Sequence, residues 1–510
     1  MDAKSSDHNL SILLRQYAET QPEEPLLYYN ELEIPASTVW QDACRLSRGL
    51  QQNGVLFGSR VLLMLPNSPE YLTAYYAILI AGAIVVPVNV MLRERELHYM
   101  MEDSEACAII AQESSVQDVI NAASSLVTMR TLILCSPQER PNTIRLRGLI
   151  EWSEPAAGPA EVSPDDTAVI MYTAGMTGHP KGAELTHRSL LGNARNGIDI
   201  MRVRSKDRIL GVLPFYHAYG QTAVMNLSVA AGAGIVLLSD FDPVQVMDAV
   251  EKYQITIFMV TPSMYRMILL ETEGRAYDFS SVRYCVSGGS ALKPELLEAF
   301  EKRFNASIYE GYGLSETSAI ATFNQLNHDR RPGSIGTPID CVEVKLVDDL
   351  GEEVNPGEVG EITIKSIFMM KGYLHRPEAT KAVLKNGWFY TGDLARQDED
   401  GYLYIIDRKT DMIVKGGFNV YPVEIEELLM SHPDIAEAAV IGIPDDIQGE
   451  EIKACIVLRE GSQISANQLS DYCRQYMSRY KCPRYIQFYQ QLPRNPQGRV
   501  WKQKLRSLSS

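Results

Sequence analysis

The stretch that decides the fold is residues 172–182, which read Tyr-Thr-Ala-Gly-Met-Thr-Gly-His-Pro-Lys-Gly. Its three glycines let the backbone approach a ligand closely and turn N–H groups towards it. The hydroxyls of Thr173 and Thr177 add donors, and Lys181 adds a point charge that suits phosphate. A strand-like segment (167–171) precedes the loop and a helix-like stretch begins near Thr186. The sequence therefore predicts a strand, loop, lysine and helix that together cradle polyphosphate; a surface turn is the alternative.

This loop matches neither of the two best-known nucleotide-binding motifs. G-x-x-x-x-G-K-[ST] fails because His179 and Pro180 follow Gly178, and Gly182 follows the lysine. No G-x-G-x-x-G opens a helix at this point either. The loop must be interpreted together with the other motifs of the chain.

Six further motifs follow in order along the chain, and with the loop they resemble the adenylate-forming superfamily. This superfamily contains acyl-CoA synthetases, firefly luciferase and the adenylation domains of peptide synthetases. The resemblance runs from about Leu10 to Leu505. The motifs are Leu-Pro-Phe-Tyr-His-Ala-Tyr-Gly (213–220), Ser-Gly-Gly-Ser-Ala (287–291), Glu-Gly-Tyr-Gly-Leu-Ser-Glu (310–316), Tyr-Thr-Gly-Asp (390–393), Asp407-Arg408 and Lys-Gly-Gly-Phe-Asn-Val-Tyr-Pro-Val-Glu (415–424). Among the members, bacterial medium- and long-chain fatty acyl-CoA ligases are the most similar.

The composition describes an acidic globular chain. It has 510 residues, and 48 basic against 64 acidic residues give a net charge of −16. This charge argues against nucleic acid or an anionic membrane as the main partner. The eight cysteines form no close pairs, which is typical of a reducing compartment. The first residues lack the apolar core of a signal peptide. We therefore expect a cytoplasmic protein, and its oligomeric state stays open, a dimer included.

One apolar stretch, residues 71–90, is long enough to suggest a membrane span. It contains Gly82 and Pro87 and ends in β-branched residues before a charged run. A buried helix followed by a core strand explains this pattern better than a span does. We therefore expect no transmembrane segment.

The pattern of elements predicts an α/β fold with two domains. We expect a large AMP-binding domain (1–407) of layered α/β subdomains, in which a distorted antiparallel β part occupies about 333–407, and a small mobile α+β lid (408–510). Helices are predicted at 43–52, 243–253, 294–304, 422–430 and 465–478, the last with Ser465 and Gln468 as a capping box. Strands are predicted at 60–64, 132–135, 235–238, 255–260, 283–286, 342–347, 360–365, 401–406, 438–443 and 453–458.

The resemblance implies that ATP activates a carboxylic acid by transferring AMP to it. The residues implied to hold the phosphates are Thr173, Ala174, Gly175, Met176, Thr177, Gly178 and Lys181. Those implied at the adenine and ribose are Gly288, Gly289, Ser290, Glu310, Gly311, Tyr312, Gly313, Ser315, Asp393 and Arg408. Tyr312 would stack on adenine, and Asp393 would accept from the ribose hydroxyls. Glu316, with Thr173 beside it, would bind Mg²⁺, which prefers one or two protein oxygens besides phosphate and water.

The acid and the acceptor would meet at His217. By resemblance this histidine lines the carboxylate site, although a lone histidine is more often a packed core residue. The motif around it offers no aspartate for the ammonium group of an amino acid, which favours a fatty or aryl acid. Gly220, Met225, Val260, Gly288 and Gly313 would leave an apolar tunnel. The loop that begins at Lys415 would face the second substrate, and Lys415 is included among the catalytic residues.

Four positions depart from the family pattern. Ala174 and Met176 remove two hydroxyls from the phosphate loop, and Thr410 stands where the hinge usually has Asp or Lys. Arg499 occupies the position of a catalytic lysine that promotes adenylation. Arginine keeps the charge but is planar and longer, so the exchange is not conservative. The departures together indicate an altered or slow first step.

Three functions are compatible with these motifs. The first is an ATP- and Mg²⁺-dependent ligase of fatty acid metabolism that joins a small carboxylic acid to CoA. The second keeps adenylate formation but passes the acyl group to the pantetheine of a carrier protein or to an amine. The third is a degenerate acyl- or nucleotide-binding partner with impaired adenylation, which Arg499 supports.

Overall fold

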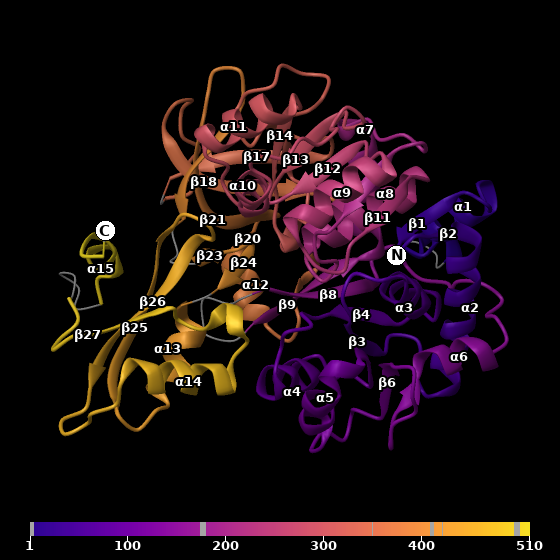
Figure 1. The fold of residues 1–510 in the computed structure, drawn as a ribbon, viewed down its shortest axis with the longest axis horizontal. Helices are drawn as coiled ribbons and strands as arrows, with labels where there is room; N and C mark the ends of the chain where they lie inside the picture. The colour runs from indigo at the N-terminus through magenta and orange to yellow at the C-terminus, as the bar shows by residue number, and fades with distance from the viewer. Residues whose placement is uncertain are drawn as a thin grey trace.

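The structure, a computed structural model, describes residues 5–173, 180–348, 350–408, 413–420, 422–493 and 500–509. We call residues 5–408 the large unit and 413–509 the small unit. Figure 1 shows the small unit, in yellow and light orange, at the left of the large unit. The structure confirms the predicted mixed α/β class. The boundary between 407 and 408 remains our proposed domain division.

A nine-stranded sheet forms the upper layer of the large unit (Figure 1). Its strands are β1 (Pro25–Tyr29), β2 (Leu32–Pro35), β10 (Arg208–Gly211), β11 (Gly234–Leu237), β12 (Ile257–Val260), β13 (Tyr284–Ser287), β14 (Ile308–Tyr312), β15 (Thr322–Phe323) and β16 (Thr337–Pro338). The strand order is β16-β15-β14-β13-β12-β10-β11-β1-β2. The pairs from β14 to β1 are parallel, whereas β2, β15 and β16 are antiparallel edges.

An eight-stranded sheet forms the lower layer. Its strands are β3 (Arg60–Met64), β4 (Ile84–Pro87), β5 (Ala108–Gln112), β6 (Thr131–Cys135), β7 (Ile144–Arg145), β8 (Thr167–Thr173), β9 (Lys181–Thr186) and β19 (Gly372–Tyr373). The strand order is β19-β9-β8-β4-β3-β5-β6-β7. The pairs from β8 to β7 are parallel, and β9 lies antiparallel between β8 and β19.

Helices cover both sheets and fill the space between them. They are α1 (Ile12–Thr20), α2 (Ala36–Gln52), α3 (Pro69–Ile80), α4 (Glu94–Asp103), α5 (Val116–Ala123), α6 (Leu146–Trp152), α7 (His187–Met201), α8 (Leu227–Ala231), α9 (Pro243–Tyr253), α10 (Pro262–Glu271) and α11 (Pro294–Phe304). The predicted helices 243–253 and 294–304 have the same bounds as α9 and α11. Proline at the first position suits both, because its missing N–H would have no partner there.

Helix α3 is the centre of the main core. The side chain of Ser68 caps it by accepting a hydrogen bond from the backbone N–H of Tyr71, at 3.2 Å. Every residue from 71 to 80 is buried. The same hydrophobic cluster contains Val61 and Val85 of the lower sheet and Ile235 of the upper sheet. Because it is covered on all sides, α3 needs no polar face.

The prediction of a buried helix and a following strand at 71–90 is confirmed by α3 and β4. Among the described residues, no helix is long and apolar enough to cross a membrane.

The rest of the large unit is an antiparallel β part, as predicted. Its strands are β17 (Val342–Val347), β18 (Val359–Ser366), β20 (Leu384–Lys385), β21 (Trp388–Gln397) and β22 (Leu403–Arg408), and α12 (Pro377–Val383) precedes β20. All four pairings in this sheet are antiparallel. A small core that includes Ile362, Ile364 and Leu403 supports it.

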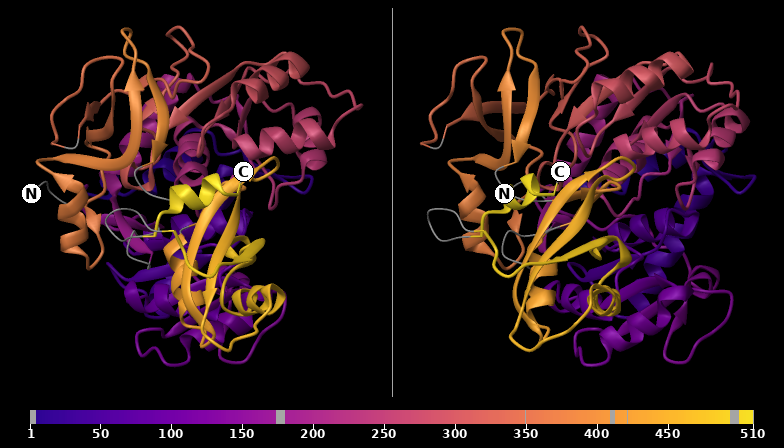
Figure 2. Two further views of the ribbon diagram at one scale, coloured as in Figure 1. Left: turned by 90° about the vertical axis from the view of Figure 1, so that its left-hand side faces the viewer. Right: turned by 60° about the vertical axis from the view of Figure 1, so that its left-hand side comes forward.

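The small unit packs helices on both faces of its own sheet. Its elements are β23 (Ile413–Lys415), β24 (Phe418–Val420), α13 (Pro422–Met430), β25 (Ile435–Asp445), β26 (Gly449–Leu458), α14 (Ala466–Tyr476), β27 (Tyr485–Phe488) and α15 (Lys502–Ser507). Helices α13 and α14 pack on one face of the sheet and α15 on the other. Leu429 of α13 and Leu469 of α14 pack on Ile452 and Ile456 of β26. The predicted capping box of Ser465 and Gln468 is confirmed. Figure 2 shows the small unit beside the indigo and purple segments of the large unit. Lys481 of the small unit donates a hydrogen bond to Glu96 of the large unit.

The surroundings of the phosphate loop differ from the prediction in one respect. The loop joins β8 to the antiparallel strand β9, and α7 begins only after β9. The helix predicted to begin near Thr186 is confirmed by α7, whereas the strand that starts at Lys181 was not predicted. In β9, Ala183 and Leu185 are buried core residues, and the strand gains a second partner in β19. This partner comes from residues 372–373, so the local sequence could not reveal it.

Candidate active site

A cavity of ≈ 880 Å³ lies between the two sheets and reaches the small unit. Its lining brings together ten of the predicted site residues: Thr173, Lys181, His217, Gly288, Gly289, Gly311, Tyr312, Gly313, Ser315 and Glu316. Four predicted residues that the structure describes lie outside the lining: Ser290, Glu310, Asp393 and Lys415. The other predicted positions lie outside the described residues: Ala174, Gly175, Met176, Thr177, Gly178, Thr410 and Arg499. The side chain of Arg408 is likewise not described.

The end of the cavity that we predicted to bind phosphate is built around Glu316. Its side chain is buried, and its Oε1 accepts a hydrogen bond from the hydroxyl of Thr173 at 3.1 Å. The hydroxyl of Tyr373 donates to the same oxygen at 2.8 Å. The ammonium of Lys181 lies 5.2 Å from the centre of the Tyr373 ring, a cation–π distance. Burial lowers the pKa of Lys181, and the carboxylate of Glu316 opposes this shift.

Two residues of α4 hold the strands on either side of the phosphate loop. The hydroxyl of Tyr99 donates to the carbonyl of Pro180 at 2.8 Å, where β9 begins. Asp103 accepts from the hydroxyl of Tyr172 at 2.9 Å, where β8 ends. Arg376 pairs with the other oxygen of Asp103 at 2.6 Å. Both sides of the loop are therefore fixed to one helix.

One wall of the cavity follows β14 into the loop after it. The hydroxyl of Tyr312 donates to Oδ2 of the buried Asp393 at 2.6 Å, so these two predicted residues meet although 81 positions separate them. Asp393 contacts the hydroxyl of Tyr312 but does not itself line the cavity. A Cβ on Gly313 would lie 1.6 Å from the carbonyl oxygen of Ala319. Gly313 is thus required by the close approach of two backbone segments.

Glu310 has a different environment from the one its motif suggests. Its carboxylate is buried, and Oε1 accepts a hydrogen bond from the backbone N–H of Gly333 at 2.7 Å. Burial raises the pKa of this carboxyl group to about 7. Glu310 therefore ties β14 to the turn at Gly333 from outside the cavity.

The second wall comes from residues 212–223. It includes the segment after β10 and the start of the π-helix η3 (Tyr219–Asn226). The side-chain amide of Asn67 donates to the carbonyls of Gly211 and Leu213 at 3.1 and 2.9 Å, and Asn67 Oδ1 accepts from the N–H of Phe215 at 2.9 Å. Apart from His217, this wall carries no acidic or basic side chain.

His217 lies in this wall at the point where the small unit reaches it. Its ring is enclosed by protein, and this burial lowers its pKa to about 4, so that the imidazole is neutral at pH 7. Nε2 has no hydrogen-bond partner among the described residues. The ring centre lies 4.9 Å from that of Tyr216 and 5.8 Å from that of Phe418. A buried nitrogen without a partner is available to a ligand.

The expected apolar tunnel is only partly correct. Met225 and Val260 are buried in the core and do not line the cavity. A Cβ on Gly220 would lie 2.2 Å from the carbonyl oxygen of Pro214, so Gly220 serves a tight turn. The apolar lining includes Met201, Ala223 and Met264 instead.

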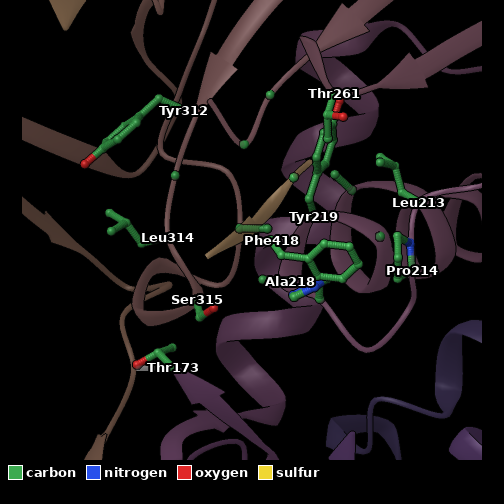
Figure 3. Close-up of a pocket in the computed structure, with 18 of the residues that line it drawn as sticks. Thr173, Leu213, Pro214, Ala218, Tyr219, Thr261, Tyr312, Leu314, Ser315 and Phe418 are labelled. Atoms are coloured by element: carbon green, nitrogen blue, oxygen red, sulfur yellow. The ribbon is translucent and has the colours of Figure 1, made fainter. Parts of the chain in front are cut away.

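The turn between β23 and β24 brings the small unit to the cavity. Gly416, Gly417 and Phe418 line it together with Gln448. Figure 3 shows Phe418 between the side of Tyr312 and Ser315 and the side of Leu213 and Pro214. Lys415 itself is engaged elsewhere, because its ammonium lies 2.5 Å from Oε1 of the buried Glu451.

Several residues of the site carried no recognised sequence signal. Asn67, Tyr99 and Asp103 lie far along the chain from the motifs they support. Tyr373 follows Gly372 in a short Gly-Tyr segment, and only its contacts with Glu316 and Lys181 mark it.

Among the described residues, no three His, Cys, Asp or Glu side chains gather as a metal site. A cation held here would therefore rely on Glu316, Thr173 and the ligand's own oxygens, which suits Mg²⁺.

Two family models match the chain. The model of the AMP-binding enzyme covers residues 14–374, and that of the AMP-binding enzyme C-terminal domain covers residues 424–499. A long-chain-fatty-acid–CoA ligase of Bacillus subtilis is 34% identical over 97% of this chain and 94% of its own. A feruloyl-CoA synthase of Amycolatopsis is 35% identical over 91% of each chain.

A solved structure with the same architecture is that of o-succinylbenzoate CoA synthetase from Bacillus subtilis, a double mutant bound with a product analogue. It is 29% identical, covers 97% of this chain and 98% of its own, and has a TM-score of 0.87.

Proposed function

The chain belongs to the AMP-binding enzyme family, and from this premise we propose that it activates a carboxylic acid with ATP and joins it to CoA. One observation carries the proposal. A single cavity is lined by Lys181 and Glu316, which would face phosphate, and by the uncharged wall at His217. This arrangement allows a triphosphate and an apolar acid to bind with their reacting groups adjacent.

In the first step a carboxylate oxygen attacks the α-phosphorus of ATP, and the bond to pyrophosphate breaks. Lys181 would neutralise the departing phosphates, and Tyr312 and Asp393 would hold the adenine and ribose. Glu316 and Thr173 would hold Mg²⁺, whose oxygen preference they match. When bound, the cation neutralises negative charge that builds up on the phosphate oxygens. The neutral His217 would border the carboxylate without adding charge.

In the second step a thiol attacks the carbonyl carbon of the acyl-adenylate. The carbon–sulfur bond forms, the bond to the AMP oxygen breaks, and the thiol proton is released. The turn at Gly416 and Gly417 would border the path of the thiol. Neither residue has a side chain to obstruct it, and Phe418 would exclude water from the anhydride.

We propose a fatty or aryl monocarboxylic acid as the substrate. The wall from 212 to 223 would disfavour a second carboxylate on the acid, because it carries no cation and Asp240 also lines the cavity. The relatives act on long-chain fatty acids and on ferulate by name. We place the reaction in the cytoplasm, since all eight cysteines are free thiols.

Pyrophosphate exchange tests this function. The protein is incubated with ATP, Mg²⁺, labelled pyrophosphate and one acid at a time, from acetate to palmitate and from benzoate to ferulate. We expect exchange with at least one apolar acid, and a thioester of the same acid, identified by mass, when CoA is added. Exchange without a CoA product would direct the search to carrier-protein thiols and amines. Absence of exchange with every acid would refute the proposal and favour a binding protein.

A further inference from the structure

Lys481 lies between two carboxylates that belong to different units. It is in the short helix η5 (Arg479–Lys481) of the small unit. Its ammonium lies 2.9 Å from Oε1 of Glu96 on α4 of the large unit, and 2.8 Å from Oε2 of Glu424 on α13 of the small unit. The three side chains are only 8, 15 and 10% exposed. This is a buried ionic contact across the boundary between the units.

Both carboxylate oxygens of Glu96 contact the small unit. While Oε1 binds Lys481, Oε2 accepts a hydrogen bond from the hydroxyl of Ser478 at 2.8 Å. Charge-assisted hydrogen bonds of this kind are stronger than neutral ones and fix direction as well as distance. The pair of contacts therefore fixes where η5 sits on α4.

A chain of aromatic contacts leads from this contact to the cavity. Tyr480, next to Lys481, lies with its ring centre 4.6 Å from that of Phe418. Phe418 in turn lies 5.8 Å from His217 in the cavity wall. Fixing η5 against α4 therefore fixes the side chain that closes the cavity over His217.

The helix that receives η5 also supports the phosphate end of the cavity. Glu96 is near the start of α4, whereas Tyr99 and Asp103, which hold the strands beside the phosphate loop, follow it on the same helix. A ten-residue helix is short and stiff. The small unit is thus positioned relative to the reacting groups through a single rigid element.

The orientation held in this way presents an uncharged turn of the small unit to the cavity. The described small-unit residues that line the cavity are Gly416, Gly417, Phe418 and Gln448, and none is charged. Lys415 is paired with Glu451. Adenylation gains most from cations aimed at phosphate oxygens, whereas attack by a thiol needs an open, uncharged path.

We propose that Glu96 is a positioning residue for thioester formation, because it holds the small unit, through Lys481 and Ser478, in the orientation that opens this path. The inference rests on the proposed two-step function.

Glu424 allows the two units to separate, because it remains an ionic partner of Lys481 when Glu96 moves away. Burial alone would lower the pKa of Lys481, but Tyr480 and the two carboxylates raise it well above its usual value. When the units separate, Lys481 keeps its partner Glu424, and Glu96 passes to solvent. No unpaired charge is left buried, so separation avoids the largest electrostatic penalty.

The test compares the two half-reactions in Glu96→Gln, which keeps the shape of the side chain but removes its charge. We expect the single-turnover rate of acyl transfer from preformed acyl-adenylate to CoA to fall roughly ten-fold or more, since a hydrogen bond to a charged group is lost. Pyrophosphate exchange should stay the same or rise. Ser478→Ala, which loses only one contact, should show a smaller fall in transfer.

The control is Glu102→Gln, an exposed glutamate on the same helix. An equal fall in both half-reactions would mean a structural role and overturn the proposal, as would unchanged transfer.

A second measurement needs no substrate. Hydrogen exchange, followed by mass spectrometry, is compared in the free wild-type and Glu96→Gln proteins for peptides that cover 476–484 and 94–103. We expect faster exchange in the variant at both, and no change in Glu102→Gln. Unchanged exchange at 476–484 would overturn the proposal. The hydrogen-exchange result does not depend on the reaction. If the wild-type protein shows no pyrophosphate exchange with any acid tested, the proposed function is refuted. The contact between Glu96 and the small unit is then still tested by hydrogen exchange.

Discussion

The hydroxyl of Tyr373 donates a hydrogen bond to Oε1 of Glu316 at 2.8 Å. Thr173 donates to the same oxygen, and the Tyr373 ring supports the ammonium of Lys181. One tyrosine thus contacts both the carboxylate that we assign to Mg²⁺ and the cation that we assign to phosphate. Its strand, β19, pairs with β9, which begins at Lys181, so the geometry is fixed by the sheet.

We predict that Tyr373→Phe lowers the rate of adenylation roughly ten-fold, because the orienting hydrogen bond to Glu316 is lost while the ring remains beside Lys181. The Mg²⁺ concentration for half-maximal pyrophosphate exchange should rise. Magnesium titrations of the exchange rate measure both. Tyr485→Phe, in the exposed strand β27, is the control. An unchanged magnesium requirement in Tyr373→Phe would contradict the assignment of Glu316.

We predict that Asp103→Asn destabilises the large unit by about 2–4 kcal/mol, because Arg376 loses its charged partner and only one acceptor oxygen remains for Arg376 and Tyr172. The KM for ATP should rise as well, since β8 loses its attachment to α4 beside the phosphate loop. Thermal unfolding and ATP kinetics measure these effects. Asp118→Asn, which removes only the more exposed pair with Arg93, should cost no more than about 1 kcal/mol. Equal melting temperatures for the two variants would show that Asp103 has no special role.

We predict that His187 makes the folded protein less stable in acid. Its Nδ1 accepts from the backbone N–H of Leu10 at 2.9 Å, and burial lowers its pKa to about 4. Between pH 6.5 and 4 the unfolded chain binds a proton that the folded protein does not. The free energy of unfolding therefore decreases as the pH falls through this range, by about 3 kcal/mol at most. His187→Asn keeps an acceptor for Leu10 but cannot titrate in this range. Urea unfolding between pH 4 and 7 should show a weaker pH dependence in this variant, and no such change in His328→Asn, where the histidine is exposed.

Glu310 should have the opposite effect. With its pKa raised to about 7, the folded protein keeps a proton that the unfolded chain loses near pH 4.5, so stability falls as the pH rises between these values. We predict that Glu310→Gln, which can still accept from Gly333, gains about 2–3 kcal/mol over the wild type by pH 8 and little at pH 4.5. The difference in unfolding free energy between the two proteins measures this. A difference that does not change with pH would show that Glu310 ionises normally.

We predict that Arg499→Lys raises the rate of adenylation, because it restores the compact ammonium found at this position in the family. A well-aimed donor contributes roughly 10²–10³ in rate at such sites. Pyrophosphate exchange under saturating ATP and acid measures the gain, and Lys502→Arg, a nearby exchange of the same kind, is the control. A lower rate in Arg499→Lys would mean that the site is adapted to arginine.

Local sequence was sufficient where an element depends on its own residues. The bounds of α9 and α11 were predicted because proline marks each start and an apolar face follows. The prediction for α14 relied on the reciprocal capping of Ser465 and Gln468. The motifs also brought ten predicted residues to one cavity, because they follow neighbouring strands of the two sheets.

The sequence was insufficient where a partner lies far along the chain. The strand β9 has a second partner in β19, nearly 200 residues away, and no local pattern reports this pairing. Gly220 and Gly313 line the cavity as predicted, but their missing side chains also make room for the backbone of Pro214 and Ala319, which the sequence did not reveal. Lys481 looks like an ordinary surface lysine in sequence, and only the meeting of Glu96 and Glu424 explains its burial. The roles of the individual site residues remain predictions.

The two walls of the cavity come from separate pieces of chain. We assign the side formed by residues 311–316 to the nucleotide and the side formed by residues 212–223 to the acid. Substitutions of Ala218 or Ala223, in evolution or by design, should therefore change the preference for the acid while residues 311–316 stay the same. New specificities can evolve on this scaffold without reinventing its chemistry.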